Sequence, residues 1–216
     1  MVEAVPLISF FLYAFTAIFV IVNPINALFT FVSMTSGYPE KMKNLYAKKA
    51  ILLATGVAIF FAIAGSLVLE FLGISVDSLR VAGGILLFTI GYNMMTAKMN
   101  QNVTQAEIDE SQEKDFWVFP IAIPLLCGPG LISTVIVLMG GSSSLTNDIT
   151  IIVSIMLVFA ITYVGFYFSR KISKYLGYTG TLVITRLLGL FLAAIAVGMI
   201  TLGLYNIFKL FIAGTF

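Results

Sequence analysis

The sequence predicts an all-α membrane protein whose six transmembrane helices form two inverted repeats of three, with the first and fourth helices broken within the membrane. Three observations predict this fold: an apolar composition, six uncharged runs, and landmarks that recur at nearly the same offset. Of the 216 residues, 60% are hydrophobic and 10% are charged, and the mean hydropathy is +1.06. Because a soluble domain carries about a quarter charged residues, we expect lipid to surround most of this chain.

Six runs without Asp, Glu, Lys or Arg divide the chain. They cover residues 4–39, 50–69, 81–97, 116–147, 149–169 and 187–208. A transmembrane helix needs roughly 20 apolar residues, so each run predicts one span, and the first and fourth runs exceed that length. Glu3, with no basic residue before it, argues against a cleaved signal peptide in the first run.

The positions of Lys and Arg predict the orientation, because cytoplasmic loops carry an excess of basic residues. Six alternating spans place ten basic residues on one face and only two, Arg80 and Lys209, on the other. The ten are Lys41, Lys43, Lys48, Lys49, Lys98, Lys114, Arg170, Lys171, Lys174 and Arg186. We therefore expect a multi-pass protein of the cell membrane with both termini outside.

The two halves of the chain share landmarks. Pro24 matches Pro129 at an offset of 105 residues, and the segment 80–83 (RVAG) matches the segment 186–189 (RLLG) at an offset of 106. The agreement predicts a three-span repeat over residues 1–100, a polar cytoplasmic linker at 101–115, and a second repeat over 116–216. Three spans is an odd number, so the second repeat would be inverted, which is an architecture of transporters. The alternative is coincidence among glycine-rich membrane helices.

The first run contains the segment 23–31 (NPINALFTF), whose first residues predict a helix break. Pro24 has no N–H group, so the carbonyl of Val20 would lose its helical partner. A residue before proline is also driven out of the α conformation. Asn23 is therefore expected to end one helix and to cap the next, with Pro24 at the favoured first position.

The fourth run contains the segment 124–133 (PLLCGPGLIS). The same run has three prolines within ten residues: Pro120, Pro124 and Pro129. Pro129 would free the carbonyl of Leu125, and the glycines on either side of Pro129 permit backbone conformations that a regular helix cannot hold. Irregular backbone survives in a membrane only inside protein or beside a water-filled cavity. The alternative is that both prolines only kink packed helices.

Two helix starts near the middle of the membrane would form a binding site. N–H groups at a helix start favour a carboxylate, and freed carbonyls favour an ammonium group. An amino-acid zwitterion offers both groups, and the uncharged runs provide no counter-ion for a substrate with net charge. The predicted substrate-binding residues are Asn23, Pro24, Ile25, Asn26, Ala27, Cys127, Gly128, Pro129, Gly130, Leu131, Ile132 and Ser133.

Other residues exclude or weaken further functions. The chain has no histidine, and Cys127 is its one cysteine, so neither a metal cluster nor a cysteine nucleophile with a partner base is expected. An enzyme, a cofactor and a nucleic-acid partner are therefore not predicted. Arg80 and Arg186 are expected to reach toward opposite membrane interfaces, with a gating role as the alternative. A proton or sodium remains possible as a coupling ion.

The quoted motifs resemble those of the MarC/SnatA family of multi-spanning proteins. That family carries N-P-x-G-x-x-P-x-F in its first span and P-L-x-x-G-P-G-x-I-S in its fourth. The fourth-span pattern is complete here; in the first-span pattern Asn23, Pro24 and Phe31 fit, whereas Asn26 replaces glycine and Phe29 replaces proline. The resemblance implies transport of small neutral amino acids such as glycine and alanine, with export proposed for several members, and a site at the two broken helices.

The residues alone predict a transporter, by exchange or export, of a small neutral or zwitterionic solute. The main rival is an aquaporin-like channel for small uncharged solutes, which also has six spans, inverted repeats and two Asn-Pro motifs at half-helix starts. Those channel motifs lie in re-entrant loops after the second and fifth spans, whereas here the breaks lie in the first and fourth runs, and one of them contains Asn-Pro.

Overall fold

The computed structural model describes residues 7–35, 37–96, 117–142 and 144–212, and within these ranges the chain is helical and contains no strand. The elements are α1 (Leu7–Val22), α2 (Pro24–Met34), α3 (Glu40–Phe71), α4 (Val76–Met95), an irregular helical segment η2 (Trp117–Leu126), α6 (Pro129–Gly140), α7 (Leu145–Tyr167) and α8 (Ser169–Ile212). The predicted linker 101–115, with Lys98 and Lys114, lies outside the described residues.

Four segments of the described chain are long and apolar enough to cross a membrane. They are Leu7–Met34, Glu40–Phe71, Leu145–Tyr167 and Thr179–Ile212, and a fifth is added if η2 and α6, bent by 50°, count as one span. The prediction of six spans is therefore supported in part. The remaining predicted run, 81–97, corresponds to most of α4, a helix of 20 residues with Asp77 and Arg80 in its first turns, and α4 is not among these segments.

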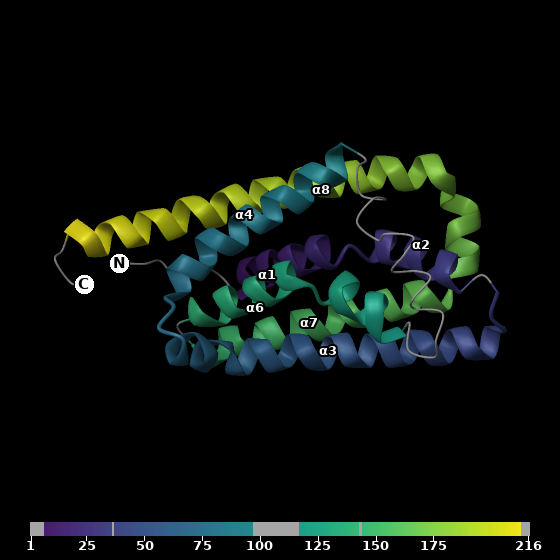
Figure 1. The fold of residues 1–216 in the computed structure, drawn as a ribbon, viewed down its shortest axis with the longest axis horizontal. Coiled ribbons are helices and arrows are strands. Elements are labelled where there is room, and N and C mark those ends of the chain that lie inside the picture. Colours follow the sequence, from purple (N-terminus) through teal and green to yellow (C-terminus); the bar gives the residue numbers. More distant parts are fainter. Residues whose placement is uncertain (1–6, 36, 97–116, 143, 213–216) are drawn as a thin grey trace.

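The helices lie roughly along one direction (Figure 1). α3 and α7 pack side by side along one edge, α1 and α6 lie in the middle, and α4 and α8 form a pair that crosses the other edge. α1 begins and α8 ends at the same end of the bundle, whereas α3 begins and α4 ends at the opposite end. Which end faces the cytoplasm, and with it the position of both termini outside the cell, stays a prediction.

α4 and α8 pack backbone to backbone in an antiparallel pair. A Cβ atom added to Gly91 would lie 2.7 Å from the carbonyl oxygen of Gly189, and one added to Gly189 would lie 2.8 Å from the carbonyl oxygen of Gly91. Further along the pair, the Cβ position of Gly203 is 2.9 Å from the carbonyl oxygen of Asp77. Small residues permit this close approach of membrane helices, so α4 and α8 form one tightly packed unit.

The largest group of buried side chains is shared by α1, α2, α3, η2, α6 and α7. Alanines at every fourth position of α3 (Ala54, Ala58 and Ala62) are completely or almost completely buried in it. Phe31 of α2 stacks on Phe166 of α7, with ring centroids 4.5 Å apart and an angle of 9° between the ring planes. This core therefore fixes the α1–α2 segment against helices that lie far away in the sequence.

α8 changes direction at Gly177, whose φ of 61° lies in the left-handed region that glycine adopts without strain. The apolar part of α8 begins just after this point, at Thr179. The residues before the turn connect α7 to the long segment that pairs with α4 (Figure 1).

Candidate functional site

The first predicted break lies between α1 and α2. α1 ends at Val22, Asn23 takes a left-handed conformation with φ 47° and ψ 65°, and α2 begins at Pro24. Asn23 is 4% exposed, and its Oδ1 atom accepts a hydrogen bond of 3.3 Å from the backbone N–H of Asn26. The N-cap role expected for Asn23 is therefore present. Asparagine suits the position twice, because it caps helices and tolerates the left-handed region.

The second predicted break lies between η2 and α6. Phe119 and Ile123 take extended conformations inside η2, as expected for residues that precede Pro120 and Pro124. The chain is thus irregular at more places than the break predicted at Pro129. Glycine is required at position 128, because an added Cβ would lie 2.5 Å from the carbonyl oxygen of Pro124.

One face of α4 contacts both breaks. It consists of Gly83, Leu87, Ile90 and Met94, spaced by four, three and four residues, and we call it the α4 face. The Nδ2 atom of Asn23 is 4.0 Å from the sulfur of Met94. A Cβ added to Gly130 would lie 2.8 Å from Cδ2 of Leu87 and 3.4 Å from Cδ1 of Ile90. The Cβ position of Gly83 is 2.6 Å from the hydroxyl oxygen of Ser133.

The two breaks also approach each other directly. The Cβ position of Gly130 lies 4.0 Å from Cγ2 of Ile21, which is two residues before Asn23. Val22, Ala27, Cys127 and Leu131 belong to the same group of buried side chains. The structure therefore brings segments about 105 residues apart in sequence to one place, with the α4 face as a shared wall.

The helix start of α2 is largely satisfied from within. The N–H of Asn26 donates to the side chain of Asn23, and the N–H of Ala27 donates to the carbonyl of Asn23 over 3.1 Å. Of the N–H groups of Ile25, Asn26 and Ala27, two are therefore already bonded to Asn23.

The helix start of α6 is more open. Gly128 provides no side-chain cap, and the N–H of Ile132 donates to the carbonyl of Gly128 over 3.1 Å. The N–H groups of Gly130 and Leu131 precede the first turn and have no carbonyl partner within the helix. Of the two predicted helix starts, α6 thus offers more backbone hydrogen-bond capacity for a ligand.

Hydroxyl groups gather at the carbonyl of Gly130. Ser133 donates to this oxygen over 3.0 Å and Thr134 over 2.9 Å, and both side chains are buried. Sequence reasoning included Ser133 but missed Thr134, whose signal was its position four residues after Gly130. It also missed the α4 face, because Gly83 was noted only as part of the repeated segment 80–83; the regular spacing of the four residues was the available signal.

The remaining predicted residues differ in burial. Ala27 and Cys127 are fully buried, Ile25, Asn26, Gly128 and Ile132 are half-buried, Pro24, Gly130 and Leu131 are buried, and Pro129 is exposed. The N–H of Cys127 donates to the carbonyl of Ala122 over 2.9 Å. Among the residues that the structure describes, no three His, Cys, Asp or Glu side chains form a group that could hold a metal ion.

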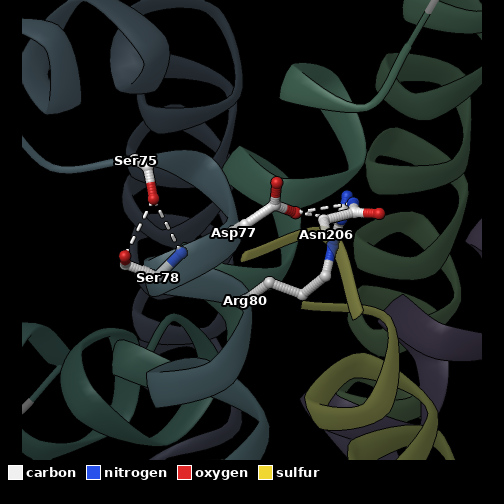
Figure 2. A network of polar contacts seen from close by, with 5 residues as sticks. All are labelled: Ser75, Asp77, Ser78, Arg80 and Asn206. Atoms are coloured by element: carbon white, nitrogen blue, oxygen red, sulfur yellow. Dashed lines mark hydrogen bonds and ion pairs between the residues drawn. The ribbon is translucent and has the colours of Figure 1, made fainter. Parts of the chain in front are cut away.

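The two arginines in the repeated landmark have different surroundings. Arg80 is 9% exposed and forms an ion pair with Asp77, whereas Arg186 is exposed. Asp77 also accepts a hydrogen bond of 3.0 Å from the amide of Asn206 in α8. Figure 2 shows this cluster beside the separate Ser75–Ser78 pair at the start of α4. A carboxylate one turn away and the packing of α8 against α4 enclose the Arg80 side chain. The expected positions of Arg80 and Arg186 at opposite membrane interfaces stay predictions.

Comparison with known proteins places the chain in a family. Residues 8–208 match the description of the MarC family integral membrane proteins. The chain is 39% identical over 203 residues to the UPF0056 membrane protein YvbG of Bacillus subtilis, covering 93% of this chain and 96% of the relative. It is 36% identical over 198 residues to a UPF0056 membrane protein of Methanocaldococcus jannaschii, covering 91% and 97%.

A UPF0056 membrane protein of Aquifex aeolicus is 34% identical over 201 residues, which cover 92% of this chain and 94% of the relative. No solved structure matches the chain. The similarity extends over almost the whole of each sequence and includes both breaks, α4 and α8. This protein is therefore a multi-pass integral membrane protein and belongs to the MarC family.

Proposed function

We propose that this protein transports small neutral amino acids, such as glycine and alanine, across the cell membrane by exchange or export. The observation that carries the proposal is the meeting of the two interrupted segments on the α4 face. In one place, the chain offers uncapped N–H groups at the start of α6, the buried amide of Asn23, and backbone carbonyls of irregular segments. A zwitterion needs donors for its carboxylate and acceptors for its ammonium group.

The charge of the surroundings favours a substrate without net charge. α1, α2, η2 and α6 contain no Asp, Glu, Lys or Arg. Asp77 and Arg80, at the start of α4, form an ion pair with each other. A buried net charge on the substrate would lack a partner, and desolvating it would be costly. The amide and hydroxyl groups of Asn23 and Ser133 are suited to neutral polar groups.

The packing supports an arrangement of two inverted repeats, each comprising one interrupted span and two further helices. α3 of the first half packs against η2 and α6 of the second, and α7 of the second half packs against α1 and α2 of the first. α4 packs against α6, and α8 packs against α1 and α2. Each interrupted segment thus lies among helices of the other half, as a pseudo-twofold axis would require. Alternating access would then change the packing of the interrupted segments against α4 and α8.

The alternative is an aquaporin-like channel for small uncharged solutes, favoured by the meeting of two half-helix starts. A transporter and a channel differ in saturation. A transporter presents its site to one side at a time, so its flux saturates and accelerates when unlabelled substrate is present on the far side. Flux through a channel shows neither property.

Counterflow in proteoliposomes tests the proposal. Vesicles are loaded with unlabelled glycine, labelled glycine is added outside, and alanine, leucine and glutamate are tested as competitors, with and without a proton or sodium gradient. We expect saturable exchange that alanine competes for and that leucine and glutamate do not. The gradients identify any coupling ion. Rapid, non-saturating flux of uncharged solutes would overturn the proposal in favour of the channel.

A matched pair of glycine substitutions locates the site. Gly130→Leu forces a large side chain against Leu87 and Ile90 at the start of α6. Gly56→Leu adds the same side chain on α3, where nothing lies within 4 Å of the Cβ position. We expect Gly130→Leu and Asn26→Leu to abolish exchange while folded protein remains in the membrane. Gly56→Leu should exchange normally. Normal exchange by both site variants would place the substrate elsewhere.

A further inference from the structure

A partly buried polar cluster joins three helices at the end of the bundle where α8 terminates. Arg80 of α4 donates to Asp77 one turn earlier, and the amide of Asn206 in α8 donates to the same oxygen of Asp77 over 3.0 Å. We call Asp77, Arg80 and Asn206 the polar latch (Figure 2). The side chains of Arg80 and Asp77 are 11% and 22% exposed, respectively, so both charges are largely removed from water.

The latch also reaches the far end of α6. A Cβ added to Gly141, the C-cap residue of α6, would lie 3.2 Å from Nη2 of Arg80 and 3.2 Å from the carbonyl oxygen of Val137. The last carbonyls of a helix are the negative end of its dipole and favour a nearby cation. The guanidinium therefore lies between the carboxylate of Asp77 on α4 and the carbonyl end of α6.

The α4–α6 contact near the polar latch also has an apolar part. Beyond the α4 face, the Cβ position of Gly140 is 2.9 Å from Cγ2 of Val76. The Arg80 guanidinium adds a charged group to this contact, beside Gly141. Separating α6 from α4 at this end would thus release the guanidinium from the helix end and admit water to the start of α6.

An ion pair is suited to a contact that must open and close. Burying two charges costs desolvation energy that their attraction only roughly repays. When water enters, both charges are solvated again, so the open state is not strongly penalised. An apolar contact of the same size would lose hydrophobic stabilisation on opening without such compensation.

We propose that the polar latch is the gate that closes the site from the end of the bundle where α1 begins and α8 ends. Arg80 holds the carbonyl end of α6 against α4, and Asp77 and Asn206 are positioning residues that fix the guanidinium. The latch rests on the proposed transport function for its role in exchange. Its effect on access can be measured whatever the substrate is.

Cys127 provides a native reporter of opening, because it is the chain's single cysteine, lies at the second break and is fully buried. The rate of its modification by a membrane-impermeant methanethiosulfonate is measured in right-side-out and in inside-out vesicles. We expect Arg80→Gln and Asp77→Asn to raise the rate by about tenfold in one vesicle orientation only, equivalent to about 1.4 kcal/mol in the opening equilibrium.

Two controls separate gating from general loosening. Lys209→Gln removes one positive charge from an exposed side chain one turn after Asn206, and Ser78→Ala removes an exposed hydroxyl in the same turn as Asp77. Both should leave the Cys127 rate unchanged. A rise in both vesicle orientations, an equal rise in Lys209→Gln, or no rise in either latch variant would overturn the proposal. A rise in inside-out vesicles alone would support the latch and reverse the predicted orientation.

A cross-link tests the same contact without removing the charges. The Cβ position of Gly140 lies 3.6 Å from Cβ of Val76, within the range that a disulfide spans. Val76→Cys combined with Gly140→Cys should form a disulfide that stops glycine exchange, with recovery after reduction. Undiminished exchange in fully cross-linked protein would show that α6 does not part from α4 here. If neither form of this variant exchanges glycine, the Cys127 rates decide: a lower rate in the cross-linked form supports the latch, and an equal rate contradicts it.

Discussion

The amide nitrogen of Asn23 lies 4.0 Å from the sulfur of Met94, so the residue that interrupts the first span also contacts α4. Methionine sulfur is a weak acceptor, and the contact therefore positions the amide more than it stabilises the fold. Asn23 performs three tasks in one residue: it adopts the left-handed backbone, caps α2 and contacts the α4 face. The backbone task can be separated from the two side-chain tasks, because glycine keeps the conformation and lacks the amide.

Replacing Asn23 tests the left-handed backbone. Asn23→Gly keeps the conformation and removes the cap, whereas Asn23→Ala removes the cap and also strains the backbone at φ 47°. We expect Asn23→Ala to be less stable than Asn23→Gly by about 1–2 kcal/mol. Unfolding in detergent, followed by tryptophan fluorescence, measures the difference. Equal stability of the two variants would mean that the chain at this position can relax out of the left-handed region.

Replacing Gly128 tests the geometry of the second break. A methyl group at this position would lie 2.5 Å from the carbonyl oxygen of Pro124, and neither backbone segment can move without reshaping η2. We expect Gly128→Ala to destabilise the protein by about 1–3 kcal/mol, which is typical of overpacking, and to abolish glycine exchange.

The matched control for Gly128→Ala is Gly56→Ala, which adds the same methyl group in a helix where it meets no atom within 4 Å. That variant should be as stable as the parent or slightly more stable, because alanine is the better helix former. Normal exchange by Gly128→Ala would show that the Pro124 carbonyl is not held where the structure places it.

A double-mutant cycle tests the contact between the α4 face and α6. Gly83→Ala would place a methyl group 2.6 Å from the hydroxyl oxygen and 2.8 Å from the Cβ of Ser133. Ser133→Gly removes both of these atoms. We expect Gly83→Ala alone to destabilise by about 1–3 kcal/mol and the double variant to recover part of that loss, with a coupling energy above about 0.5 kcal/mol. Strictly additive stabilities would contradict the contact.

The cap at Asn23 was predicted from the sequence. The extended backbone before Pro120 and Pro124 follows from the same kind of constraint, which acts within one or two residues, although the break was expected only at Pro129. Proline limits its own φ and the conformation of its neighbour, and asparagine tolerates the left-handed region. The family motifs at both breaks could likewise be recognised from the sequence, because the residues of each motif lie within one short segment.

The α4 face and the polar latch could not be predicted in the same way. Asp77 and Asn206 are separated by 129 residues, and nothing near either residue specifies the other. The burial of Arg80 depends on how α8 packs against α4. The residues near Arg80 do not specify this packing, so the sequence suggested only a position at the membrane interface. The extent to which Asn23 satisfies the α2 helix start was also missed, since a free helix start and a self-capped one share the same local pattern.

Replacing Gly91 tests whether α4 and α8 act as one unit. A methyl group at Gly91 would lie 2.7 Å from the carbonyl oxygen of Gly189 and 2.9 Å from the backbone nitrogen of Ala193, so the two helices must separate to admit it. Gly198, on the same helix pair, has no atom within 4 Å of its Cβ position. We expect Gly91→Ala to lower stability by about 1–3 kcal/mol and Gly198→Ala to leave it unchanged or raise it.

Because the latch joins α4 and α8 through Asp77 and Asn206, separation of these helices at Gly91 should also raise the modification rate of Cys127. If stability falls while the Cys127 rate stays constant, the pairing of α4 with α8 supports the fold without controlling access to the site.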